Sequence, residues 1–216
     1  MKKVVKFGGS SLANAEQFQK VGDIIRSDES RRYVVPSAPG KRFDEDIKVT
    51  DMLYGCYDAA SKGEDFSDKL KAIKERYYEI IKGLGLTLSL EDEFKKIEED
   101  FRAQAGIQYA ASRGEFLNGK IMAAYLGYDF VDAASVIRFD KNGNLEAEET
   151  NKLLSKKLSK CQSAVIPGFY GACADGTVKT FSRGGSDVTG SIVARATHAD
   201  MYENWTDVSG FLIADP

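Results

Sequence analysis

A short β-branched segment that runs directly into two glycines constrains the fold of this chain more than any other feature. Residues 4–7 read Val-Val-Lys-Phe, and Gly8-Gly9 follow at once. The apolar positions that come next recur at helical spacing: Leu12, Ala15, Phe18, Val21, Ile24 and Ile25. Ser10-Ser11 are candidates to cap that helix, and residues 33–35 form a second β-branched run. Strand, glycine loop, helix and strand in this order predict the start of a parallel α/β sheet.

The remainder of the chain divides into a helical middle and a strand-rich end. Apolar stripes at helical spacing run from Lys48 to about Gly106, with a break at 83–85, and a further helix is predicted to follow 112–115. After Gly127 the pattern predicts strands at 129–132, 135–138, 164–171, 177–180 and 201–206, with a glycine loop at 183–187 that opens an apolar helix. There is no internal repeat or linker, which favours one continuous domain.

Composition excludes several classes of function. The net charge of −3 and the pI near 5.4 argue against nucleic acid as a partner, because phosphate-backbone binding needs a concentrated basic face. The scattered Cys56, Cys161 and Cys173 and the single His198 predict neither a disulfide framework nor a zinc site. We expect a cytoplasmic protein that does not enter the membrane, because the sequence has no signal peptide and no run of about 18 apolar residues.

The first glycine loop, Lys6 to Ser11, is a candidate phosphate grip. Glycines let backbone N–H groups approach phosphate oxygens, and Lys6 could neutralise a transferring phosphoryl group. A plain glycine turn beside a surface lysine explains the spacing equally well. The segment is not a Walker A loop, since no GxxxxGK[ST] occurs in the chain.

The second glycine loop, residues 183–187, also precedes a predicted helix. Arg183 could hold a carboxylate with its bidentate fork, and Ser186 and the loop amides could share that task. Asp187 could orient a lysine or help to place a metal ion. The alternative is that Ser186 or Asp187 simply caps the helix, but two such loops with cations nearby favour the functional interpretation.

Three other residues have simple structural explanations when they are considered alone. Glu115 would be favoured in a helix's first turn by the helix dipole. Thr50 would serve as a helix cap. Asp207 follows a strand and so would lie either in a turn or at the carboxyl edge of the sheet, where α/β proteins bind ligands.

Five segments in order along the chain resemble the aspartokinases of the amino-acid-kinase superfamily. They are KFGGSS at 6–11, VVPSAPGK at 34–41, RGE at 113–115, FSRGGSDVT at 181–189 and WTDVSGFLIADP at 205–216. One such motif would be weak evidence, whereas five in order from one end of the chain to the other are specific.

The resemblance implies a three-layer αβα sandwich with a mainly parallel sheet. It also implies phosphorylation of the side-chain carboxylate of L-aspartate by ATP, with Mg²⁺, as the first step towards lysine, threonine and methionine. No protein residue is assigned as a metal ligand. By position, the catalytic residues are Lys6 and Asp187. Of these, Asp187 would organise the catalytic lysine. The nucleotide would be held by Lys6, Phe7, Gly8, Gly9, Thr206 and Asp207. Aspartate would be held by Ser37, Thr50, Glu115, Arg183, Gly184, Gly185 and Ser186, with Arg183 on the α-carboxylate and Glu115 on the ammonium.

Aspartokinases carry about as much sequence again, including the rest of the nucleotide-binding lobe and paired ACT domains. We therefore expect residues 1–216 to be a C-terminally truncated catalytic domain, made of the amino-acid-binding lobe and the start of the nucleotide-binding lobe. Such a chain is expected to bind ligand without catalysing turnover. The full-length enzyme is expected to be a homo-oligomer. Two alternatives are another amino-acid kinase, acting on glutamate, acetylglutamate or carbamate, and a non-catalytic ligand-binding fragment.

Overall fold

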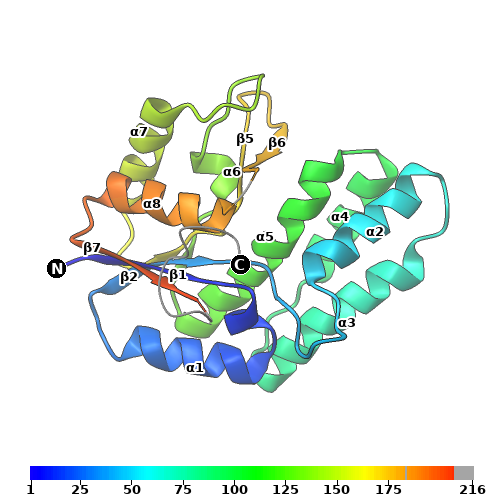
Figure 1. The fold of residues 1–216 in the computed structure, drawn as a ribbon, viewed down its shortest axis with the longest axis horizontal. Coiled ribbons are helices and arrows are strands. Elements are labelled where there is room, and N and C mark those ends of the chain that lie inside the picture. Colours follow the sequence, from blue (N-terminus) through cyan, green and yellow to red (C-terminus); the bar gives the residue numbers. More distant parts are fainter. Residues whose placement is uncertain (183, 207–216) are drawn as a thin grey trace.

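The fold is built around a parallel sheet near the centre of the molecule (Figure 1). A computed structural model describes residues 1–182 and 184–206. The strands are β1 (Lys3–Phe7), β2 (Arg31–Pro36), β3 (Asp129–Phe130), β4 (Ala164–Val165) and β7 (Met201–Trp205), in the spatial order β3-β4-β2-β1-β7. Every neighbouring pair is parallel, so all carboxyl ends lie along one edge.

Alternate strand residues face two separate hydrophobic cores, as the two-residue repeat of a strand requires. Val5, Phe7 and Val34 join the core shared with the helices that follow β1 and β2, whereas Val4 and Val35 join the core beneath the last helices. A sheet covered on both faces explains why β1 is buried from Val4 and β2 from Tyr33 to the end of each strand. The expected three-layer αβα sandwich is confirmed.

The helices divide between the two faces, as Figure 1 shows. Below the sheet in that view lies α1 (Ala15–Arg26), after the short 3₁₀ turn η1 (Ser10–Leu12). To the right are α2 (Val49–Ser61), α3 (Ser67–Gly83), α4 (Glu91–Arg102) and the long α5 (Ile107–Leu126). Above are α6 (Ala133–Val136), α7 (Ala147–Leu158) and α8 (Gly185–Thr197), together with the antiparallel hairpin β5 (Tyr170–Ala172) and β6 (Val178–Thr180).

Three local expectations were wrong, and one helix was missed. The cap of α1 is Asn14, whose side chain accepts from the Gln17 N–H at 2.9 Å, rather than Ser10-Ser11, which form η1. Helix α5 begins at Ile107, so residues 112–115 lie inside it. Residues 135–138 contain the end of α6 in place of a strand, and α7 was not predicted.

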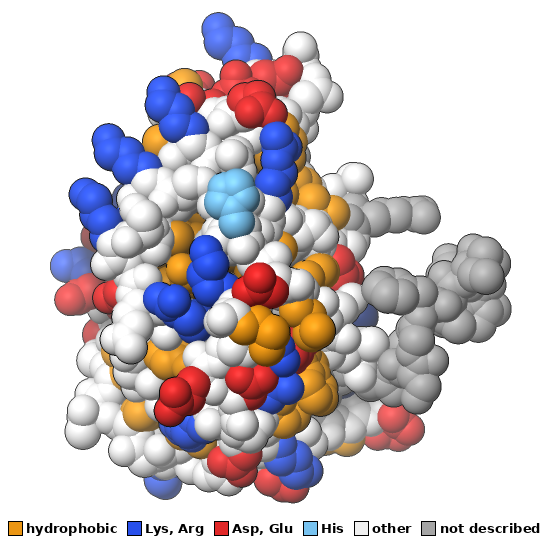
Figure 2. All heavy atoms as spheres, turned by 90° about the vertical axis from the view of Figure 1, so that its left-hand side faces the viewer, with side chains coloured by type: hydrophobic (Ala, Val, Ile, Leu, Met, Phe, Trp, Pro, Cys, Tyr) orange, Lys and Arg blue, Asp and Glu red, His pale blue; other side chains and the backbone are white. Residues whose placement is uncertain are grey.

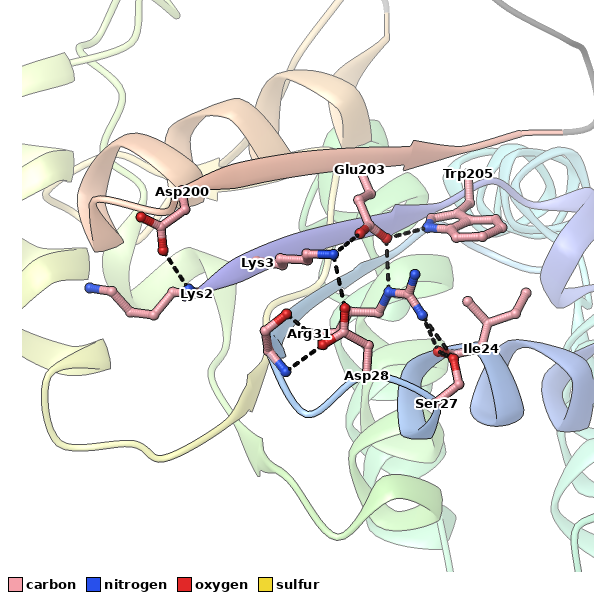
Figure 3. Close-up of polar contacts among 10 residues, drawn as sticks. Lys2, Lys3, Ile24, Ser27, Asp28, Arg31, Asp200, Glu203 and Trp205 are labelled. Atoms are coloured by element: carbon pink, nitrogen blue, oxygen red, sulfur yellow. Dashed lines mark hydrogen bonds and ion pairs between the residues drawn. The ribbon is translucent and has the colours of Figure 1, made fainter.

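The strands β1, β2 and β7 are joined by a network of charged side chains (Figure 3). The Glu203 carboxylate lies 3.0 Å from Lys3 Nζ and 2.8 Å from Arg31 Nε, and it accepts from the Trp205 indole N–H at 3.0 Å. Lys3 Nζ also pairs with Asp28 at 2.8 Å. These contacts join the starts of β1 and β2 to the second half of β7.

The face of the molecule that carries the only histidine, His198, has mixed charge (Figure 2). Figure 2 shows Lys and Arg side chains interspersed with Asp and Glu on this face. Within the described ranges, no helix combines the length and apolar character needed to cross a membrane.

Candidate active site

A cavity of about 450 Å³ lies where the carboxyl ends of β1, β2 and β7 meet the first turn of α2 and the middle of α5. A parallel sheet brings these ends together, although the residues are far apart in the sequence. The lining residues are Gly8, Gly9, Ser10, Ser37, Ala38, Pro39, Gly40, Lys41, Lys48, Thr50, Glu115 and Thr206. Six of the residues predicted for the site, Gly8, Gly9, Ser37, Thr50, Glu115 and Thr206, are therefore brought together.

Glycines allow the loops after β1 and β2 to pack backbone against backbone. The Gly40 N–H donates to the Gly9 carbonyl at 2.8 Å. A Cβ on Gly9 would lie 2.8 Å from the Ala38 carbonyl oxygen, and one on Gly40 would lie 2.6 Å from the Gly9 carbonyl carbon. Neither glycine has a positive φ, so it is close approach and not backbone conformation that requires them.

Gly8 keeps space open beside the predicted catalytic lysine. A Cβ there would meet nothing nearer than Lys6 Nζ and the Trp205 carbonyl oxygen, both at 3.9 Å. Lys6 is itself only 8% exposed, and its Nζ lies 2.9 Å from Asp187 Oδ1. The structure thus pairs the two residues predicted to be catalytic, one from β1 and one from the first turn of α8.

Glu115 is a buried carboxylate that faces the cavity. Its side chain is on the inner face of α5, only 6% of the residue is exposed, and burial raises the pKa of Glu115 to about 8. The Ala38 N–H donates to the carboxylate and offsets part of that shift. Oε2 has no hydrogen-bond partner among the described residues. A buried acceptor of this kind favours a cationic, hydrogen-bonding ligand.

The simple structural explanations for Glu115 and Thr50 were wrong. Glu115 is not an exposed residue of a helix's first turn, and the residue at the N-cap of α2 is Lys48, which makes no side-chain capping bond. Thr50 lies in the first turn of α2, and its Oγ1 is 3.8 Å from where a Cβ on Gly114 would stand. The glycine of the RGE segment therefore lets α5 approach both α2 and the loop after β2.

The start of α8 is close to Lys6 but is not part of the cavity lining. The N-cap is Gly184, at φ 55°, and it makes no side-chain capping bond, so neither Ser186 nor Asp187 is the cap. Ser186 is buried, with its Oγ 2.4 Å from where a Cβ on Gly168 would stand. Gly185 packs against Phe169 in the same way. Phe7 is buried, and its ring stacks on Trp205 with centroids 6.0 Å apart, so only its backbone is available to a ligand.

Two of the predicted site residues, Arg183 and Asp207, lie outside the described residues. Among the residues that are described, no group of three His, Cys, Asp or Glu side chains could hold a metal ion.

Comparison with known proteins assigns the chain to a family. The sequence model of the Amino acid kinase family matches residues 1–216. This chain belongs to the amino acid kinase family. Aspartokinase 3 of Bacillus subtilis is 39% identical to it over 228 residues, which cover 99% of the chain and 50% of that protein.

Solved structures agree with this assignment. The aspartate kinase of Clostridium acetobutylicum superimposes with a TM-score of 0.94 at 52% identity, covering 100% of this chain and 50% of that one. Aspartokinase III of Escherichia coli, in complex with aspartate and ADP, superimposes with a TM-score of 0.81 at 26% identity. The match covers 97% of this chain and 50% of that one. This amino acid kinase spans about half the length of the relatives that it matches.

Several site residues of the amino acid kinase were missed by sequence reasoning. Asn118 is fully buried one turn after Glu115, and its Nδ2 donates to the Ser37 carbonyl at 2.6 Å. The Ala38 N–H on the other side of the same peptide group donates to Glu115. The signal was the i, i+3 spacing of two polar residues within an apolar helix. Lys41 and Lys48 also line the cavity, but exposed lysines in a polar loop carry no distinguishing pattern.

Proposed function

We propose that this chain is part of the catalytic domain of an aspartokinase, which transfers the γ-phosphoryl group of ATP to the side-chain carboxylate of L-aspartate. The observation that carries the proposal is Glu115, a buried carboxylate whose Oε2 has no hydrogen-bond partner among the described residues, in a cavity lined by the KFGGSS glycine loop. An α-ammonium group supplies both the positive charge and the N–H donors that this oxygen lacks. The relatives reported above, all aspartokinases, support the same substrate.

The remaining roles are those that the family resemblance implies. Thr50 and Ser37 would contact aspartate beside Glu115, and the α8 loop, with Arg183, Gly184, Gly185 and Ser186, would hold its α-carboxylate. Gly8, Gly9 and the backbone of Phe7 would approach the phosphates, and Thr206 and Asp207 the nucleotide. We further propose that the whole enzyme works in the cytoplasm as a homo-oligomer.

The chemistry needs positioning and charge neutralisation more than acid–base catalysis. An aspartate side chain is already anionic, so it can attack the γ-phosphorus without a general base. One P–O bond forms to the carboxylate while the bond to the β–γ bridging oxygen breaks, and ADP leaves with that electron pair. Lys6 would neutralise charge on the transferring group, and Asp187, at 2.9 Å, holds its ammonium in place.

Mg²⁺ fits this site as an ion carried mainly by the nucleotide. Magnesium in kinases is bound by substrate phosphates and one or two carboxylates rather than by an all-protein cage, and the side chain of Asp187 is 45% exposed beside Lys6. Asp187 would share the ion, which neutralises phosphate charge when bound.

Calorimetry and turnover assays test the proposal. The chain should bind L-aspartate, and the full-length gene product should form ADP with aspartate but not with glutamate, acetylglutamate or carbamate. Preference for one of those would indicate another amino-acid kinase, and binding without ADP formation by the full-length protein would indicate a ligand-binding module.

The role of Lys6 has its own test. Lys6→Ala in the full-length protein should lower kcat by at least about a hundredfold, since one electrostatic contact to a transition state is worth that much. The dissociation constant for aspartate should change far less. An unchanged kcat would exclude the role given to Lys6.

A further inference from the structure

Arg76 is a buried arginine outside the cavity whose contacts lead to the cavity wall. It lies on α3 and is only 3% exposed. Its Nη2 donates to the Gly40 carbonyl at 2.6 Å, while Nη1 lies 2.8 Å from Asp46 Oδ2. One planar guanidinium therefore holds both ends of the segment from 40 to 46.

The Gly40 peptide cannot move independently of the site. Its N–H donates to Gly9, and the two backbones are packed too closely for a Cβ on either residue. Arg76 thus donates a hydrogen bond to a residue that directly contacts the proposed phosphate-binding loop. Both glycines line the cavity, so a shift of Gly40 changes its shape.

Asp46 connects the same guanidinium to the far end of the loop. It accepts from the N–H and Nε of Arg42, each at 2.9 Å, and Arg42 Nη1 lies 3.1 Å from Glu79 of α3. The Val49 N–H then closes the loop on the Pro39 carbonyl at 3.2 Å, immediately before Thr50. The loop is therefore fixed to α3 by charged hydrogen bonds, which are stronger than neutral ones.

We infer that Arg76 is a positioning residue: by holding the Gly40 carbonyl and Asp46 together, it sets the contact between Gly9 and Gly40 and the position of Thr50 in the cavity. A simple stabilising ion pair would need only Asp46. The direct bond to Gly40 gives the guanidinium a second acceptor in the loop, which an ion pair with Asp46 alone does not require. The inference rests on the proposed function for its ligand.

The test is Arg76→Lys in this chain, because a lysine keeps the charge but cannot span both acceptors. The dissociation constant for aspartate should rise about tenfold, the effect of losing one charged hydrogen bond. Amide hydrogen exchange should accelerate at Gly40 and Val49. Arg138→Lys is the control, since Arg138 also reaches two acceptors, the carbonyls of Ala134 and Ser135, but lies near α6. It should change neither quantity.

Each outcome decides something different. Unchanged affinity and unchanged exchange in folded Arg76→Lys would overturn the inference. If wild-type chain binds no aspartate, the proposed function fails instead, and the exchange rates alone still test whether Arg76 holds the loop. Should Arg76→Lys not fold, Arg76→Gln takes its place: it keeps one donor for Gly40, loses the charge, and should show the same weaker binding, whereas wild-type affinity would overturn the inference.

Discussion

At the scale of single residues, the site depends on a carboxylate whose burial is unfavourable without a ligand. Desolvation raises the pKa of Glu115 to about 8, far above the value near 4.5 of an unburied glutamate. The folded state therefore binds a proton between these values that the unfolded chain releases. Stability from this group is fully present below about pH 4.5 and is lost as the pH rises through about 8.

Glu115→Gln should remove this dependence. The free energy of unfolding of the wild-type chain should fall with pH by an amount on the order of 3–5 kcal/mol more than that of the variant. Urea unfolding between pH 4.5 and 9 measures both curves. Parallel curves would show that Glu115 is not the titrating group, and the variant should also lose aspartate binding.

Adjacent glycines should respond differently to the same substitution. Gly9→Ala forces a Cβ to within 2.8 Å of the Ala38 carbonyl and should destabilise the chain by about 1–3 kcal/mol, whereas Gly8→Ala meets only atoms at 3.9 Å. Gly8→Ala should unfold like wild type but bind nucleotide more weakly, because the methyl group occupies space beside Lys6. Thermal unfolding and nucleotide titration of both variants would separate these effects, and equal stabilities would contradict the packing argument.

At the scale of elements, the sequence predicted those whose signal is local. The Val-Val runs of β1 and β2, the aromatic-containing β7 and the glycine opening of α8 were all recognisable, because each has a local sequence signal. Helix α7 was missed although Glu148 and Glu149 open it and Lys156 and Lys157 close it, a charge order that suits the helix dipole. Its few buried positions gave a weak apolar stripe.

The cap of α1 gives an element-scale prediction. Asn14→Ala should lower the free energy of unfolding by about 1 kcal/mol, because it leaves the Gln17 N–H without its side-chain acceptor. Ser11→Ala, at the position first expected to cap the helix, should stay within about 0.5 kcal/mol of wild type. Urea unfolding of the two variants compares them directly, and a larger loss for Ser11→Ala would restore the original interpretation.

At the scale of the whole molecule, topology gathers what the sequence separates. Order and spacing placed Gly8 and Thr206 at strand ends and Thr50 and Glu115 at helix starts, and the family resemblance suggested that they share a ligand. That Asn118 and Arg76 support the same loop could not be predicted. Their partners are the backbone carbonyls of Ser37 and Gly40, and such contacts leave no pattern in side-chain sequence.

The charged network of Figure 3 makes a prediction at this scale. Glu203→Gln removes the negative charge that pairs with Arg31 and Lys3. It should lower the free energy of unfolding by about 1–3 kcal/mol. Glu98→Gln, which breaks the exposed pair with Arg102, is the matched control and should cost less than about 0.5 kcal/mol. Denaturant midpoints of the two variants measure the difference, and similar midpoints would mean that the network adds no stability.

Glu115 Oε2, which has no partner in the described part of the chain, has a consequence for how a ligand would enter. With its pKa raised to about 8 by burial, this carboxyl group would carry a proton at neutral pH before a ligand binds, and an arriving ammonium group would displace it. A proton and an amino acid therefore compete for one oxygen, and acidification should act on the site as a competitive inhibitor does. Each binding event near pH 7 would release up to one proton into the buffer.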